Sequence, residues 1–435
     1  MTDITPALSP DSRMDKTSND REALLARLVF ILLAAAAPLF AVLTFPPTQD
    51  NYWLRFFSTP VLAIEVLVIG CALLDGFRPM AAFRQLRPFT RIAALAWLAV
   101  ALLATLAAQS EPIVARLLML TSFVHALLGL ALYDRLRNGR LISASDTQRA
   151  LAIGALLYLA VAALFVASAW QTPEFNWAYF GAGVSNLRQI GYYGLTLTGL
   201  AAGMIAATRA RPTTYALLFA GWFLVEWCGG RASFGAAVAG TALLVLLARG
   251  RRWRIALASL ACLLAAIPLS IAAAPSPLWG ASASLTRAAA PDGQKMGENY
   301  TSGRAEIWAG TWEGIADRPI LGHGEGQFRH QVAEAYGFYN HPHNGPLQLL
   351  YQWGFAGTLA LLAMLGGVAL ALLRQPIERL RPVLPAIGAA SSLLAMSLLD
   401  GALYYVFPVM VLVVCVALCA AAASKPEKAA PVLDA

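Results

Sequence analysis

Apolar segments of about 18 or more residues recur along almost the whole chain, and they constrain its fold more than any other feature. A helix needs roughly 20 consecutive apolar residues to cross the hydrocarbon core of a membrane. Hydrophobic residues occupy 58% of the 435 positions and charged residues only 13%, whereas a soluble domain carries about 25% charged residues. The sequence therefore predicts an all-α polytopic integral membrane protein.

The apolar segments predict about twelve transmembrane helices. They cover approximately residues 28–45, 59–74, 92–108, 113–133, 151–170, 187–207, 214–229, 232–248, 255–273, 346–373, 383–399 and 403–423. The chain thus divides into a polar N-terminal tail, nine spans, a long loop, three spans and a short tail, with bounds 1–27, 28–273, 274–345, 346–423 and 424–435. The first tail is followed by no small-residue cleavage site, so we expect it to be retained.

Basic residues alternate between the loops. Of the 32 Lys and Arg residues, 23 lie in the two tails and in every second loop, and the remaining nine lie on the other side. This is the positive-inside pattern, which predicts that both termini are cytoplasmic and that the long loop 274–345 is on the outer side. The net charge of +8 is thus explained as a topology signal, and we expect no nucleic-acid partner. The five cysteines have no metal-site or disulfide spacing and are read as packing residues.

The long outer loop begins as a Pro/Ser/Ala-rich connector and then becomes denser. Arg304, Trp308 and Trp312 recur every four residues, which predicts a short helix that ends before Pro319. A second helical piece is expected in QVAEAYG, residues 331–337. Long loops with their own structure are often functional, so we expect the loop to be partly helical and part of the active surface.

Five ionisable residues within or at the ends of the predicted spans are candidates for a functional role. Arg188 and Arg231 are at outer ends, where each is either a functional group or a helix-pairing or snorkelling arginine. Glu65 and Glu226 are embedded and are interpreted as salt-bridge partners of arginines or as functional carboxylates. His125, alone in its span, is interpreted as a satisfied core histidine.

Three arginines and two histidines are predicted to share the outer face: Arg188, Arg231, Arg304, His341 and His343. Guanidinium groups bind phosphate oxygens bidentately, and a neutral imidazole takes a proton from an attacking hydroxyl. This set suits a reaction on a lipid-linked diphosphate. The outer side carries no Asp-x-Asp pair, so we expect arginines rather than a metal to stabilise the leaving group. The aromatic residues there either stack on sugars or are ordinary interfacial residues: Tyr192, Trp308, Trp312, Tyr336 and Tyr339.

Four motifs carry a resemblance to a known family. HNGPLQLLYQWGFAG has a histidine followed, after a fixed interval, by a Gly-x-x-Gly pair, here His343 and Gly354–Gly357. The loop segment RAEIWAGTWEGIADRPILGHG has the pattern Arg-x-x-x-Trp … Pro-x-x-Gly-x-Gly. CGGRASFGA and NLRQIGYY supply an arginine turn and an Asn-x-Arg entry to a span. Together these motifs resemble the O-antigen ligase and polymerase family over roughly residues 150–400, although Gly230 stands where serine is more usual.

The resemblance implies a glycosyltransferase of the GT-C-like architecture in the Gram-negative inner membrane, with its site facing the periplasm. Such an enzyme transfers O-polysaccharide from undecaprenyl diphosphate to the lipid A-core oligosaccharide, with inversion and without a metal or other cofactor. It implies His343 as the base, and Arg188, Arg231 and Arg304 as diphosphate ligands. Possible sugar or supporting contacts are Asn344, His341, Trp308, Gln348 and Tyr192. Membrane lipids are the remaining expected partners, and we expect a monomer.

Other functions stay open at this point. An O-antigen polymerase and a protein O-oligosaccharyltransferase use the same lipid-linked donor and share the histidine motif. A transporter or flippase also fits twelve spans, but its charges should be spread through the span centres at mid-depth. His341 can share the base role, although the spacing to Gly354 favours His343.

Overall fold

The computed structural model describes the part of the chain that contains the predicted site and most of the predicted spans. The described residues are 59–139, 143–170, 175, 177, 187–208, 210–248, 250–289, 304–333 and 341–424. Over these residues the secondary structure is helical, without strands. The first predicted span, residues 28–45, and both tails lie outside the described residues.

Each of the other eleven predicted spans coincides with a helix. The long elements are α3 (Thr59–Leu74), α5 (Pro88–Leu106), α6 (Pro112–Arg137), α7 (Ala144–Ala169), α8 (Ile190–Ala207), α9 (Pro212–Trp227), α10 (Arg231–Leu247), α11 (Arg252–Ala272), α15 (Gly345–Leu373), α17 (Leu384–Ser397) and α18 (Val406–Ser424). Shorter elements are α4 (Pro79–Gln85), α12 (Gly280–Ala289), α13 (Arg304–Asp317), α16 (Ile377–Leu380), η2 (Leu187–Gln189), η3 (Arg329–Ala333) and η4 (Arg381–Val383). Within the described ranges, eight helical segments are long and apolar enough to cross a membrane.

Prolines mark where many of these helices begin. α4, α5, α6, α9, α15 and α17 each have a proline in the first turn, where the missing N–H would have no intrahelical partner. α7 is capped instead by Ser143, whose hydroxyl accepts the N–H of Asp146. These local signals define the helix starts more closely than the apolar runs do, as for α7, which begins at Ala144 and not near residue 151.

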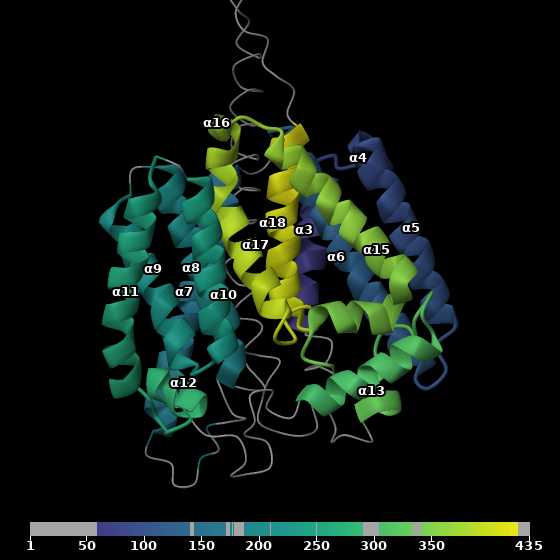
Figure 1. Ribbon diagram of the computed structural model, residues 1–435. Helices are drawn as coiled ribbons and strands as arrows, with labels where there is room; N and C mark the ends of the chain where they lie inside the picture. Colours follow the sequence, from purple (N-terminus) through teal and green to yellow (C-terminus); the bar gives the residue numbers. More distant parts are fainter. Residues whose placement is uncertain are drawn as a thin grey trace, which may run out of the picture.

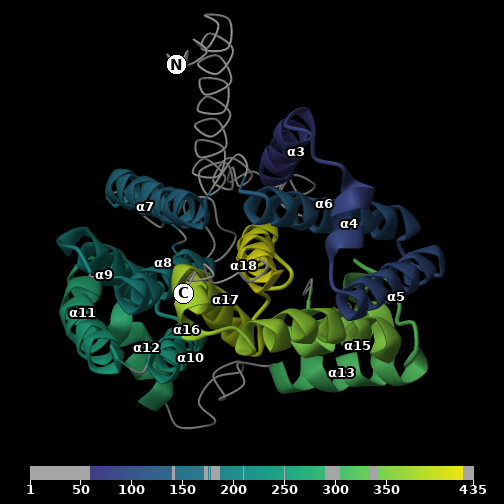
Figure 2. The same ribbon diagram turned by 90° about the horizontal axis from the view of Figure 1, so that it is seen from above.

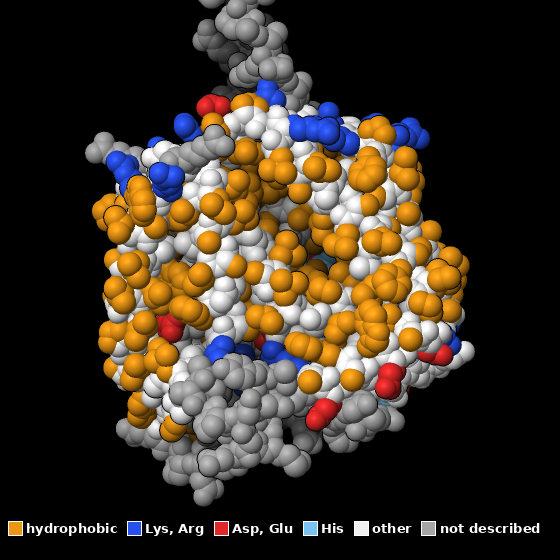
Figure 3. Space-filling view, in the orientation of Figure 1, with side chains coloured by type: hydrophobic (Ala, Val, Ile, Leu, Met, Phe, Trp, Pro, Cys, Tyr) orange, Lys and Arg blue, Asp and Glu red, His pale blue; other side chains and the backbone are white. Residues whose placement is uncertain are grey.

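Two groups of helices flank α18 (Figures 1 and 2). One group contains α8 to α12 with α17, and the other contains α3 to α6 with α13 and α15; α18 packs on α6, α15 and α17. The outer surface between the two ends of the bundle is largely apolar, while Lys and Arg gather at the end opposite α13 (Figure 3). The end that carries α13 is here called the site end.

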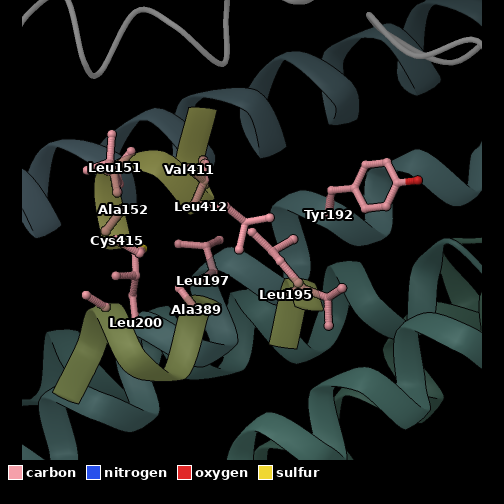
Figure 4. Close-up of a cluster of buried hydrophobic side chains, with 14 of the residues drawn as sticks. Leu151, Ala152, Tyr192, Leu195, Leu197, Leu200, Ala389, Val411, Leu412 and Cys415 are labelled. Atoms are coloured by element: carbon pink, nitrogen blue, oxygen red, sulfur yellow. The ribbon is translucent and has the colours of Figure 1, made fainter. Parts of the chain in front are cut away.

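The core centres on α8, which packs against α9, α10 and α17. Figure 4 shows part of this core, where apolar side chains of α8 meet those of α7, α17 and α18. Gly199 lies so close to Gly388 and Ala389 of α17 that a Cβ on it would come within 2.4 Å of the Ala389 nitrogen. Small residues thus allow the two backbones to touch, as is common in membrane helix packing. α8 therefore forms a rigid support for the residues at its site end.

The structure corrects two expectations about the long loop. The connector after Ala274 contains α12, and Trp279 beside it is buried and donates its indole N–H to the Trp177 carbonyl at 3.0 Å. The predicted span 346–373 coincides with α15, but the helix is not continuous, because Gly354 has φ 59° and ψ −169° and breaks it. Residues 345–353 lie crosswise to residues 355–373 (Figure 1). A hydropathy pattern does not detect a break made by one glycine.

Candidate active site

The break in α15 is held by the loop that follows α13. Four backbone hydrogen bonds join the two segments: Phe355 to Pro319 (2.7 Å), Ala356 to Ile320 (3.2 Å), His323 to Tyr351 (2.9 Å) and Gly324 to Gln352 (2.9 Å), with the N–H donor named first. An interrupted helix leaves N–H and C=O groups without partners, and inside a membrane protein these must be satisfied. The loop supplies those partners and fixes the direction in which residues 341–353 run.

Glycines in both motifs permit this close approach. A Cβ on Gly354 would lie 2.2 Å from the Ile320 oxygen, and a Cβ on Gly322 would lie 2.6 Å from the Gly354 nitrogen. Both residues also have positive φ, 59° and 69°, which side chains disfavour. The segments with the Pro-x-x-Gly-x-Gly and Gly-x-x-Gly patterns thus pack against each other, backbone to backbone.

His343 forms a pair with Asp400, a residue that the sequence analysis missed. The distance from His343 Nδ1 to Asp400 Oδ1 is 2.9 Å. Asp400 lies in the loop between α17 and α18, is buried, and also accepts the Gly401 N–H at 2.8 Å. When the imidazole is neutral and donates from Nδ1, its lone pair is on Nε2. Asp400 thereby selects the tautomer in which Nε2 is left as the acceptor.

The electrostatic surroundings keep Asp400 ionised. Burial alone raises the pKa of Asp400, but the hydrogen bond and charge of His343 and the guanidinium of Arg304 outweigh it and hold the pKa well below its usual range. Arg304 begins α13 and donates from Nη1 to the Leu399 carbonyl. The carboxylate is therefore a fixed negative charge behind the imidazole.

His341 lies behind His343 and has a different environment. Its Nδ1 accepts the His343 backbone N–H at 3.1 Å, and its Nε2 is 3.3 Å from the Tyr405 hydroxyl. Burial lowers the pKa of His341 well below its usual range, and the charge of His343 lowers it further. The Nδ1 lone pair of neutral His341 thus accepts the His343 N–H, and this hydrogen bond stabilises the conformation of the loop.

The backbone conformation of His343 is unusual. Among the described residues, His343 is the only non-glycine with positive φ, at 53°. Such a backbone costs energy and persists where the surroundings enforce it, often at functional sites. Here the bond from His343 N–H to His341 and the start of α15 provide that enforcement.

Three other residues that were predicted to contact the sugar or support the site lie next to the histidine segment. Asn344 caps α15 by accepting the Leu347 N–H at 3.0 Å, and it donates to the Leu398 carbonyl at 3.0 Å. Trp308 donates its indole N–H to the Pro342 carbonyl at 2.8 Å and so ties α13 to the histidine segment. Gln348 is buried, and it lines a cavity of about 10 Å³ beside His341, which is room for one water.

The three predicted arginines converge on the same region. The charge of Arg304 interacts with Asp400, Arg188 and Arg231, and burial lowers the pKa of Arg304. Arg188 lies in η2 at the start of α8, and Arg231 is the first residue of α10. Three positive charges are thus brought together from separate elements beside the pair of His343 and Asp400. Mutual repulsion among them is reduced when an anion binds.

Tyr192 extends from α8 away from the apolar cluster beside it (Figure 4), and it lies near Asp400 and Arg304. It is buried, its ring centre is 5.9 Å from that of Tyr405, and its hydroxyl has no hydrogen-bond partner among the described residues. Asn186, Tyr336 and Tyr339 lie outside the described residues, as do residues 334–337 of the second expected helical piece, which begins as η3.

The two embedded glutamates, Glu65 and Glu226, have different surroundings. Glu65 pairs with His125 at 2.8 Å, so the expected arginine partner of Glu65 was wrong, and His125 is a satisfied core histidine as expected. Glu226 is buried near the end of α9, and its Oε1 has no hydrogen-bond partner in the described part of the chain.

The architecture and the site together define a polytopic helical membrane protein with an arginine-, histidine- and carboxylate-containing site at one end of its bundle. Residues 215–362 match the family model of O-antigen ligases, which confirms the resemblance that the motifs indicated. The matched range contains Arg231, Arg304, His343 and the break at Gly354, whereas Arg188 and Asp400 lie outside it. A comparison with curated proteins gave no match. The family indicates glycan transfer of the O-antigen ligase or polymerase type.

Proposed function

We propose that this protein is an O-antigen ligase. It transfers O-polysaccharide from undecaprenyl diphosphate to the lipid A-core oligosaccharide at the periplasmic face of the inner membrane, with inversion at the transferred sugar. The observation that supports this most directly is the pairing of His343 with Asp400, because it gives a base at the place where a sugar hydroxyl meets a lipid-linked diphosphate.

In the proposed reaction, His343 Nε2 takes the proton of the acceptor hydroxyl as that oxygen attacks the anomeric carbon. The bond from the anomeric carbon to the diphosphate oxygen breaks, and the undecaprenyl diphosphate leaves with the bonding electrons. Asp400 stabilises the imidazolium that forms, as a carboxylate does behind a catalytic histidine. Attack opposite to the leaving group inverts the configuration.

Arg188, Arg231 and Arg304 bind the diphosphate and offset its growing charge. Guanidinium groups remain cationic and bind phosphate oxygens bidentately, so they replace the electrostatic contribution of a metal ion. We therefore expect full activity in the presence of EDTA.

The test is transfer by purified, reconstituted protein with a lipid-linked glycan donor and a lipid A-core acceptor. The parental protein should form the joined product, and His343→Ala should not. Transfer by His343→Ala at the parental rate would refute the base assignment, and activity that EDTA abolishes would refute the metal-free reaction.

Deletion in the native host distinguishes the rival functions. Loss of a ligase leaves core-only lipopolysaccharide and long glycan on the carrier lipid. Loss of a polymerase leaves a single repeat unit on the core, and loss of a protein O-oligosaccharyltransferase leaves lipopolysaccharide unchanged. A transporter would show no transfer in the purified system.

A further inference from the structure

A second polar hollow opens at the far end of α13 from Arg304. Its volume is about 340 Å³, and its lining residues come from α13, the loop after it, η3, α15 and the turn between α5 and α6: Gln109, Gly310, Glu313, Gly314, Asp317, Arg318, His323, Gln331, Val332 and Tyr351. This hollow, here called the α13 groove, contains none of the residues assigned to the reaction above.

One face of α13 forms a wall of the groove. Gly310, Glu313, Gly314 and Asp317 follow the spacing of residues that share a helix face. The helix rise places Glu313 about 14 Å and Asp317 about 20 Å along the axis from Arg304. The groove is therefore at the site end, along α13 from the residue Arg304 that lies beside Asp400.

One lining residue, His323, has a buried ring nitrogen without a hydrogen-bond partner among the described residues. His323 stacks on the Tyr351 ring, with centres 4.5 Å apart and planes at 18°, and its Nε2 donates to the Gly314 carbonyl at 2.8 Å. His323 is only 4% exposed, and its Nδ1 has no hydrogen-bond partner among the described residues. Burial lowers the pKa of His323, so Nδ1 is a neutral acceptor. A buried acceptor left without a partner in a polar hollow indicates a ligand or bound water.

Amide and hydroxyl groups continue this polar lining. The Tyr351 hydroxyl donates to Gln331 Oε1 at 2.5 Å, and Gln331 Nε2 donates to the Ser110 hydroxyl at 3.1 Å. These bonds fix the orientation of the Gln331 amide at the edge of the groove. Fixed amides next to carboxylates suit ligands with many hydroxyl groups, which both donate and accept.

The charges of the groove select among such ligands. The carboxylates of Glu313 and Asp317 outnumber the guanidinium of Arg318, which is 4.0 Å from Asp317 and donates to the Ala107 carbonyl at 3.1 Å. With His323 neutral, the groove has a net negative charge. An anionic ligand is repelled there, whereas a neutral or amino sugar is not.

We propose that the α13 groove is a carbohydrate subsite for neutral or amino sugars of the glycan, several units away from the bond that is made at His343. This assignment rests on the proposed transferase function and adds to it a site that selects the glycan. The glycan belongs either to the donor polysaccharide or to the acceptor oligosaccharide, because both reach the site end.

The test uses the full-length reconstituted protein and the variant Glu313→Gln/Asp317→Asn, with Glu306→Gln as a matched control on the exposed face of α13. Two probes are offered separately: the host O-polysaccharide released from its carrier, and the deacylated core oligosaccharide. Saturation-transfer NMR measures binding of each probe. The double variant should bind one of them about tenfold more weakly, because the amide oxygens still accept hydrogen bonds but without the charge that strengthens them.

Steady-state kinetics identify the source of the glycan. They also distinguish weaker binding, which raises KM, from a folding defect, which lowers kcat. The double variant should raise KM about tenfold for one substrate, with kcat changed less than about twofold. A raised donor KM assigns the groove to the polysaccharide, and a raised acceptor KM assigns it to the core oligosaccharide. Unchanged binding and KM for both, or equal losses in Glu306→Gln, would overturn the subsite.

The two proposals fail separately. Binding of the released glycan does not need chemistry, so His343→Ala should retain it at the parental affinity. If the reconstituted protein transferred nothing but bound the glycan through Glu313 and Asp317, the transferase would be refuted and the subsite would stand.

Discussion

Two histidine–carboxylate pairs among the described residues have almost the same geometry. At the site end, His343 Nδ1 is 2.9 Å from Asp400, and among the helices His125 Nδ1 is 2.8 Å from Glu65. Each joins elements far apart in the sequence, and each carboxylate is buried. A short distance alone therefore does not distinguish a reactive pair from a structural pair.

Their surroundings do differ. The side chain of His343 is 24% exposed, whereas that of His125 is 8% exposed. His343 has a left-handed backbone in a loop with Arg304 close to its carboxylate, while His125 is in the middle of the regular helix α6. Access, backbone strain and neighbouring cations are what mark a functional histidine, and the five predictions below test that distinction.

Removing the site histidine should have the largest effect. His343→Ala should lower the initial rate of glycan transfer by about 10²- to 10⁴-fold, the usual contribution of a general base. His125→Ala is the matched control and should keep the rate per folded molecule near the parental value. Equal losses in the two variants would erase the distinction between the pairs.

Asp400→Asn should have the next largest effect. The amide preserves the size of the side chain but removes the charge that stabilises the imidazolium, so kcat should fall about 10²-fold. Because the pKa of Asp400 is held below its usual range, the parental carboxylate stays ionised between about pH 5 and 8. An acid limb of the parental rate profile that vanished in Asp400→Asn would contradict this.

His341→Phe should act more mildly. The ring is retained, but His343 N–H loses its acceptor, so the left-handed backbone is less well fixed and kcat should fall about tenfold, as for one lost hydrogen bond. The pH profile of the remaining activity should keep its shape. A shifted profile would instead make His341 a participant in proton transfer.

Breaking the inner pair should affect stability instead of turnover. His125→Leu leaves the Glu65 carboxylate buried without its partner, which costs about 3–5 kcal/mol. The unfolding temperature in detergent should drop, while kcat at low temperature stays near parental. Replacing Glu65 by leucine as well should recover most of the stability, and failure to recover would show that the pair has another role.

The smallest effect concerns Glu325, which accepts the Ser122 hydroxyl at 3.0 Å and lies near His125. Burial raises the pKa of Glu325 to about 7 against the opposing influence of Ser122 and His125. The folded state then keeps a proton that the unfolded state releases, so stability should fall by up to roughly 3 kcal/mol as pH rises from about 5 to 7. Glu325→Gln should flatten this slope in thermal melts, and an unchanged slope would assign it to another group.

The sequence predicted the helices because each depends on a local pattern. Apolar runs place α5, α6, α9 and α17 within a few residues of their observed starts. Charge counting placed His343, Arg231 and Arg304 on one side, and the structure brings His343 and the arginines into one region. These successes share a cause, which is that each signal lies within a single segment.

The features that were missed depend on two segments at once. Gly354 breaks α15 only because the loop around Gly322 docks against it. Asp400 becomes a partner of His343 through contact between residues 57 apart in the chain. One signal was nonetheless available: a carboxylate in a three-residue outer loop, on the side already assigned to the histidines, could have been proposed as their partner.

The separation of His343 from Asp400 has a consequence for biosynthesis. The ribosome makes His343 first, and the loop with Asp400 arrives only once α17 has been synthesised and inserted. On the proposed mechanism, a nascent chain that stops after α15 has an imidazole without its carboxylate. On that mechanism, insertion of the last hairpin, α17 and α18, is the step that completes the pair of His343 and Asp400.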